Sequence, residues 1–219
     1  MFLSNPVKIF HAVCCLSMVF AGCTLWRGNE NSSVTFASQP RSEYPFVARE
    51  PEVFQADLVV QTGQTERRMF IAHNGEKRRI DYDVGTASQH GVILSDKEYL
   101  LFFKRKVFEE RSMSSNAAAS YDPLSAPMLG TRDYGSFEEI SRSGSVVQFR
   151  ARINDSSNSE AIIFFDEAIG LPVKQEFYSI EGEERKLQYS SELINFSTTV
   201  DPATFQVPAG FKKTTRGVD

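Results

Sequence analysis

The side chains that could perform catalysis are few, and they do not form a known catalytic pattern. His73 and His90 each stand outside any H-x-x-x-H or H-E-x-x-H spacing, and the chain contains no G-x-S-x-G turn or P-loop. Asp81 and Asp83 are separated by one residue. Paired carboxylates can do acid–base work, but adjacent arginines can equally neutralise them at a solvated edge. We therefore predict no catalytic residue, no metal and no cofactor, and a protein that is not an enzyme.

Cys23 is the residue with the clearest chemical assignment. Lys8 precedes an apolar run over 9–21, which is followed by Gly22 and Cys23. This order is typical of a secretion signal, and the run is shorter than the roughly 20 residues that span a bilayer. The stretch 19–23, Val-Phe-Ala-Gly-Cys, resembles the lipobox of bacterial lipoproteins, although that family usually has Leu where Phe20 stands. An ordinary cleaved signal or a plain membrane anchor is the alternative.

The lipobox resemblance implies a lipid anchor and an address. Cleavage would remove 1–22 as a signal peptide, and the thiol of Cys23 would be diacylated. Thr24 stands where an inner-membrane retention signal often has Asp, which by resemblance favours the outer membrane, facing the periplasm. We expect a bacterial cell-envelope protein held on a membrane by Cys23. Two or three acyl chains make such binding almost permanent, because each buried methylene contributes about 0.8 kcal/mol.

The charge of the chain bounds its partners. The 219 residues carry a formal net charge of −4, which argues against nucleic acid as a partner, because phosphate backbones require a basic face. One basic cluster, Lys104-Arg105-Lys106, follows Phe102-Phe103 at a predicted hairpin turn. It could contact anionic lipid headgroups, or it could be an ordinary solvated turn.

From Val53 onward, short runs of alternating polarity are separated by turn residues. Asn74-Gly75 is a strong hairpin signal, and about ten such runs predict a long, mainly antiparallel sheet. Residues 23–51 are predicted as a flexible tether, and Ser114–Thr131 as a loop. The pattern Ser136-Phe137-Glu138-Glu139 fits the start of a short helix ending near Arg142, and a solvated loop fits equally well.

Several predicted strands are apolar on both faces, and the chain has 18 phenylalanines but one tryptophan. A sheet with one wet face would alternate cleanly, so both faces must be covered over part of their area. Large β-formers that pack a core explain many of these side chains. Alternatively, some of them line an apolar pocket. The candidate cavity residues are Leu58, Val60, Phe70, Ile80, Tyr82, Leu101, Phe103, Phe149, Phe165 and Phe177.

Three segments give the chain a wider resemblance. The strand 74–82, the segment 164–174 (Phe-Phe-Asp-Glu-Ala-Ile-Gly-Leu-Pro-Val-Lys) and the ending 200–211, together with the lipobox, resemble outer-membrane lipoproteins of the LolA/LolB-like superfamily. The resemblance covers roughly 51–213. It implies a mainly β domain over 52–213, followed by a tail at 214–219. The fold would be a curved antiparallel sheet forming an unclosed half-barrel, with a few short helices as a lid over an apolar cavity.

Two functions remain open at this point. The resemblance implies that the cavity holds an apolar ligand, either an acyl chain or the lipid of a lipoprotein, as in a carrier or receptor. The chain has no amphipathic helix before its first strand and no exposed leucine loop of the kind used to deliver lipoproteins. The alternative is an envelope scaffold or assembly factor that binds other envelope proteins and whose concave face is filled. Whether that face is empty discriminates between the two.

Overall fold

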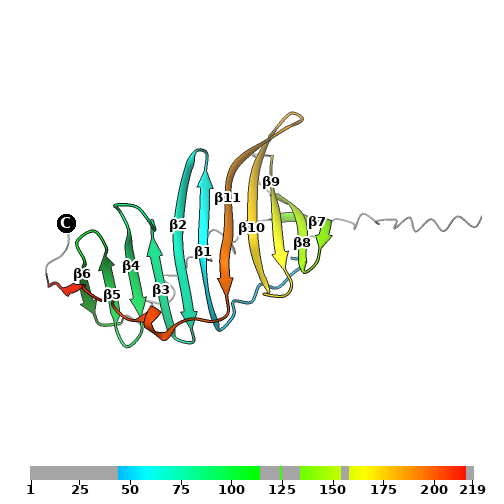
Figure 1. Ribbon diagram of the computed structural model, residues 1–219. Helices are drawn as coiled ribbons and strands as arrows, with labels where there is room; N and C mark the ends of the chain where they lie inside the picture. Colours follow the sequence, from blue (N-terminus) through cyan, green and yellow to red (C-terminus); the bar gives the residue numbers. More distant parts are fainter. Residues whose placement is uncertain (1–43, 114–123, 125–133, 154–157, 216–219) are drawn as a thin grey trace, which may run out of the picture. The chain divides into compact units, whose positions relative to one another are not determined.

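A computed structural model describes residues 44–113, 124, 134–153 and 158–215, all within the unit Phe36–Asp219. These residues form one open, curved sheet of twelve strands in the order β12-β6-β5-β4-β3-β2-β1-β11-β10-β9-β8-β7. All neighbours are antiparallel except the short β12, which runs parallel to β6. Figure 1 shows the strands side by side along the sheet. The predicted fold class, a mainly β, unclosed antiparallel sheet, is confirmed.

The strands follow the chain as two meanders. The first comprises β1 (Val53–Thr62), β2 (Thr65–Asn74), β3 (Lys77–Tyr82), β4 (His90–Leu94), β5 (Glu98–Phe102) and β6 (Val107–Arg111). The second comprises β7 (Tyr134–Ser143), β8 (Val146–Ile153), β9 (Ser159–Asp166), β10 (Leu171–Glu181) and β11 (Glu184–Ser197). The 3-10 turn η1 (Pro202–Phe205) and β12 (Lys212–Lys213) close the described part.

Tight turns set the register of the hairpins. Asn74 pairs with Lys77 across a two-residue turn whose first residue, Gly75, has φ 61°. A residue without Cβ adopts this left-handed backbone without strain. The Asn-Gly signal predicts the hairpin, although Asn74 is paired in the strand and the central residues are Gly75 and Glu76. The two meanders are joined by pairing between β1 and β11, which are far apart in the sequence. Gln55 lies opposite Ser197 in that pair.

The pleat divides side chains between two faces, which we name by residues of the central strand. The Phe54 face carries Phe54, Ala56 and Leu58, and the Asp57 face carries Asp57 and its alternate neighbours. Buried clusters lie on both faces. One, around Phe149, and another, around Leu58, lie on the Phe54 face, while a third, around Leu101, lies on the Asp57 face. The prediction that both faces are covered over part of the sheet is therefore confirmed.

Irregular segments provide the cover. On the Phe54 face, Phe46 and Ala48 pack against the clusters together with Leu124, which is 1% exposed. On the Asp57 face, the segment 200–211 packs over the β2–β6 half through Val200 and Phe205. Asp201 caps η1 by accepting a hydrogen bond from the amide of Ala203 at 2.8 Å. Extended and 3-10 backbone thus does the covering that a helix or second sheet does in other folds.

Two predictions about local structure are wrong. Residues 136–142 lie in β7, where the side chain of Phe137 is 2% exposed and pairs opposite Ala151. Bulges at 134–136 and 139–141 break the alternation of β7, so its period was hidden, and tertiary pairing with β8 overrides the helix-start pattern. The predicted lid helices are also missing from the part of the chain that the structure describes, whose one helical element is η1.

The boundary of the tether also differs from the prediction. Residues 44–51 pack on the sheet, and the amide of Arg49 donates to the carbonyl of Gly170 at 2.9 Å. The signal 1–22, Cys23 and the tether up to residue 43 lie outside the described residues, as do 114–123, 125–133 and the tail from 216.

Candidate functional site

An aromatic cluster on the Phe54 face is the most extensive apolar feature of the β7–β11 half. It is built by alternate residues of neighbouring strands, among them Phe137 in β7, Phe149 in β8 and Phe165 in β9. Phe46 inserts into it and stacks on Phe165, with ring centroids 4.6 Å apart and planes 18° apart. Tyr44 continues along the cluster, half exposed and 4.9 Å from Phe137. Residues 44–46 therefore occupy a surface that would otherwise be apolar and open.

Contacts at the end of this segment fix residues 49–52 to the sheet. Besides the Arg49–Gly170 hydrogen bond, the amide of Gly75 donates to the carbonyl of Glu52 at 3.0 Å. Glu50 Oε1 lies 2.8 Å from Nδ1 of His73, a histidine that the sequence left as an unpaired core or surface residue. We refer to residues 44–52 as the strap.

The ten candidate cavity residues do not share one face. Seven lie on the Phe54 face: Leu58, Val60, Ile80, Tyr82, Phe149, Phe165 and Phe177. The other three, Phe70, Leu101 and Phe103, pack under the C-terminal segment in the cluster of the Asp57 face. A single cavity cannot be lined by both sides of a sheet, so this structure separates these three residues from the others.

The register of the first hairpin contains the signal that separates Phe70. Thr62 pairs with Thr65, which places Phe70 opposite Asp57, while Leu58 lies opposite Met69. Since a shift of one residue reverses the face, counting back from the Gly63 turn identifies the side of each β2 residue. Leu101 and Phe103 had no such signal, because the seven-residue loop between β3 and β4 does not determine their register from sequence.

A depression of about 600 Å³ lies at a different place, between the β3–β4 loop and the β5–β6 turn. It is lined by Ala87, Ser88, Gln89, His90, Phe102, Lys104 and Arg105, and none of the ten candidate residues lines it. We call it the basic depression. Lys104 and Arg105 belong to the basic cluster seen in the sequence. No sequence pattern indicated that residues 87–90 form the other wall. Arg105 lies over the ring of Phe102, 5.8 Å from its centroid.

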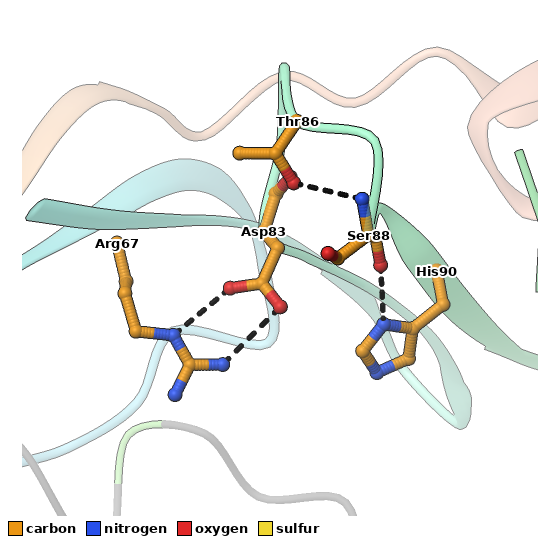
Figure 2. Close-up of polar contacts among 5 residues, drawn as sticks. All are labelled: Arg67, Asp83, Thr86, Ser88 and His90. Carbon is orange, nitrogen blue, oxygen red and sulfur yellow. Dashed lines mark hydrogen bonds and ion pairs between the residues drawn. The ribbon is translucent and has the colours of Figure 1, made fainter. Parts of the chain in front are cut away.

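The β3–β4 loop that forms one wall is held by a chain of polar contacts, shown in Figure 2. Arg67 Nε and Nη2 donate to Asp83 at 2.9 and 3.3 Å. The hydroxyl of Thr86 donates to the carbonyl of Asp83 at 2.8 Å and accepts from the amide of Ser88 at 3.1 Å. Nδ1 of His90 donates to the carbonyl of Ser88 at 3.0 Å. The wall is therefore ordered before any ligand arrives.

Asp81 and Asp83, the paired carboxylates of the sequence, have separate partners. Asp81 is buried on the Asp57 face and accepts from Arg79 Nε and Nη2 at 3.1 and 2.8 Å. Burial raises the pKa of the Asp81 carboxyl above its usual range, against the lowering effect of Arg79. Asp83 pairs with Arg67 instead. Since each carboxylate is bound by its own arginine, the two do not form one acid–base site.

A second polar depression, of about 160 Å³, lies on the Asp57 face of β7 and β8 and is lined by Ser136, Glu138, Arg150 and Arg152. Arg150 Nη1 donates to Glu138 at 3.2 Å, so this depression contains an internal ion pair. In β10, which β9 separates from β8, burial and a hydrogen bond to Glu176 raise the pKa of Tyr178 to about 12.

Within 44–113, 124, 134–153 and 158–215, no group of three or more His, Cys, Asp or Glu side chains is placed to hold a metal ion. In the same residues, no helix has the length and apolar character needed to cross a membrane.

The described residues form an open, curved antiparallel sheet, and comparisons with known proteins find solved structures that resemble it. No protein-family model and no curated protein matches the chain. A crystal structure of MucB has a TM-score of 0.49 at 16% identity, covering 74% of this chain and 59% of that one. A Pseudomonas aeruginosa MucA/MucB complex has a TM-score of 0.45 at 18% identity, covering 72% and 56%.

A third structure is an outer membrane lipoprotein-sorting protein domain from Vibrio parahaemolyticus. It has a TM-score of 0.21 at 14% identity and covers 70% of this chain and 88% of that domain. The chain spans less than two thirds of the length of the MucB structures that it matches.

Proposed function

We propose that this chain is a lipid-anchored protein of the bacterial cell envelope that binds an apolar ligand on the Phe54 face and catalyses no reaction. The ligand class is an acyl chain or the lipid of a lipoprotein, and the anchor is Cys23 at the outer membrane. The observation that carries the proposal is the insertion of Phe46 into the aromatic cluster of β7–β9. The site is apolar, and its present occupant belongs to an irregular segment.

Energetics allow an exchange of occupants. Complete burial of a phenylalanine side chain contributes about 1.5–3 kcal/mol, and each methylene of an acyl chain about 0.8 kcal/mol. Burial of about four methylenes therefore offsets the loss of the Phe46 contacts, and a longer chain has a surplus. The strap between 49 and 52 can stay bound through Arg49 and Glu52 while residues 44–46 leave.

The second candidate function is a scaffold that binds envelope proteins, and one observation favours it. Phe46 packs into the cluster around Phe149 and Leu124 into the cluster around Leu58, as in a closed core. In that case the strap is a permanent part of the fold, and removal of Phe46 destabilises the protein without creating a binding site.

Labelling with a photoreactive fatty acid separates the two functions. Cells that make the whole chain are fed palmitate with a diazirine near the end of its acyl chain and are irradiated, and labelled peptides of the purified protein are identified by mass spectrometry. The carrier function predicts saturable labelling on β8 and β9, near Phe149 and Phe165, which excess palmitate suppresses. Leu187, 46% exposed on the Asp57 face, is the reference for non-specific labelling.

Phe46→Ala provides the decisive comparison, with Tyr44→Ala as the matched control at a half-exposed neighbour. If the strap competes with a ligand, Phe46→Ala raises labelling of β8 and β9 several-fold and Tyr44→Ala raises it less. Absence of saturable labelling in the wild type and in Phe46→Ala would exclude the carrier function and favour the scaffold.

A further inference from the structure

The basic depression differs in charge from the rest of the described sheet. Most basic side chains there pair with a carboxylate: Arg67, Arg68, Arg79, Lys97, Arg111, Arg142, Arg150, Lys174, Arg185 and Lys213. Lys104 and Arg105 are among the described cations for which no carboxylate partner is found, as are Lys77, Arg78 and Arg152. These two differ in that they line one depression whose lining contains no Asp or Glu. No acidic side chain among the described residues therefore compensates the charge of Lys104 and Arg105.

Neighbouring strands add to this positive potential. Lys106, at the same turn, is exposed, and its carbonyl accepts from the amide of Lys212 at 2.9 Å. Lys212 is exposed too, and β12 reaches this edge by pairing in parallel with β6. Four cations thus gather at one edge of a chain whose net charge is −4. Such a local excess attracts anions even where the whole protein is acidic.

The depression has the features of an anion site with an apolar wall. A guanidinium that lies over an aromatic ring keeps its N–H edges available for a planar or tetrahedral anion, as Arg105 over Phe102 does. The opposite wall, 83–90, is ordered by the hydrogen bonds in Figure 2, so binding pays little to order it. A volume of about 600 Å³ holds more than one phosphate group, and Phe102 and Ala87 offer carbon surface to the remainder.

We propose that the basic depression binds a phosphate ester, with Lys104 and Arg105 contacting the phosphate and Phe102 contacting the organic group attached to it. The same chemistry is carried by a phospholipid headgroup and by a small soluble phosphate ester. The proposal concerns a different place from the aromatic cluster of β7–β9. None of the residues of that cluster and none of the ten candidate cavity residues lines the depression, although His90 and Phe102 lie on the same face of the sheet.

Lysine footprinting tests this in the whole acylated protein. The protein, held by its anchor in phosphatidylcholine nanodiscs, is acetylated briefly with a soluble reagent, and the extent of modification at each lysine is measured by mass spectrometry. Lys104 reports on the depression, and Lys186, an exposed lysine of β11, is the reference. Two probes are used: soluble glycerol 1-phosphate, and nanodiscs in which about one fifth of the lipid is phosphatidylglycerol. Potassium chloride of equal ionic strength is the control.

Binding slows acetylation of Lys104 several-fold and leaves Lys186 unchanged. Protection by glycerol 1-phosphate identifies a soluble ester as sufficient, and protection by phosphatidylglycerol alone identifies the lipid headgroup. Arg105→Gln is expected to weaken protection about tenfold, because it removes a charged hydrogen-bonding partner. Arg152→Gln, in the other polar depression, is the matched control and is expected to have no effect.

Protection of Lys104 by neither probe would overturn the proposal. Equal protection of Lys104 and Lys186 would overturn it as well, because it would reflect general screening of charge. Folding of both variants is checked by circular dichroism, and since the side chains of Arg105 and Arg152 are exposed, neither substitution disturbs a buried contact.

Discussion

Gly91 is where the smallest change is expected to have a large effect. A Cβ built on Gly91 in β4 lies closer to Asp81 Oδ1 than van der Waals contact allows, and only 3.2 Å from Asp81 Cγ and from the carbonyl oxygen of Ile80. The Asp81 carboxylate occupies this space because it is buried and bound by two nitrogens of Arg79. Gly91→Ala must therefore displace the carboxylate and loosen the ion pair.

The expected loss of unfolding free energy follows from the contribution of the buried Asp81–Arg79 ion pair. Breaking a buried pair costs about 3–5 kcal/mol, because an uncompensated charge remains in the interior. Asp81 keeps part of its contact with Arg79 after a shift, so we expect Gly91→Ala to lower the free energy of unfolding by about 3 kcal/mol. Arg79 Nη1 also donates to the carbonyl of Thr204 at 3.0 Å. The amides of η1 should therefore exchange hydrogen faster in the variant.

A double-mutant cycle tests the reasoning. Asp81→Ala alone would leave Arg79 buried without a partner, so the reference background combines Arg79→Met with Asp81→Ala. In that background the added methyl group meets no carboxylate, and Gly91→Ala should cost less than about 0.5 kcal/mol. Urea unfolding followed by circular dichroism measures all four proteins. An equal cost in both backgrounds would refute the role of Asp81 and point to backbone crowding against Ile80.

Three further predictions follow from other parts of the chain. Burial alone would raise the pKa of Asp57, but hydrogen bonds from Arg68 and Asn195 lower it overall, so the ionised form stabilises the fold. That stabilisation is present above the unfolded-state pKa near 3.8 and is lost as the pH falls through the folded-state pKa. In urea titrations, the free energy of unfolding of the wild type should therefore fall more than that of Asp57→Asn between about pH 5 and pH 3. Phe46→Ala should destabilise the protein by about 1.5–3 kcal/mol in the same assay, and Tyr44→Ala by less, because Phe46 is the inserted ring; equal costs would contradict this packing. Cys23→Ser should abolish the acyl mass on the mature N-terminus and release the protein from membranes, as mass spectrometry and fractionation would show, and an unchanged membrane fraction would exclude the lipid anchor.

Local signals in the sequence were enough for most of the sheet. The turns at Gly63 and Gly75 and the alternation of β1 and β2 depend on neighbouring residues, so the hairpins themselves were predictable. The same reasoning failed at β7. Two bulges hide its alternation, and its stability comes from pairing with β8 rather than from its own preference. The strap was missed for a similar reason, since Tyr44 and Phe46 have no periodic pattern around them.

The sequence by itself determined the class of the fold, because repeated short alternating runs with turns between them can satisfy their backbone hydrogen bonds only as an antiparallel sheet. It did not determine which apolar residues share a face. Counting from the Gly63 turn separates Phe70 from Leu58, but the face of Leu101 depends on strand register across the loop between β3 and β4, which the sequence leaves undetermined. Nor did it join 87–90 to Lys104 and Arg105, because that wall meets the basic turn only through the pairing of β4 with β5. Such placements depend on contacts between residues distant in the chain, and only the tertiary structure decides them.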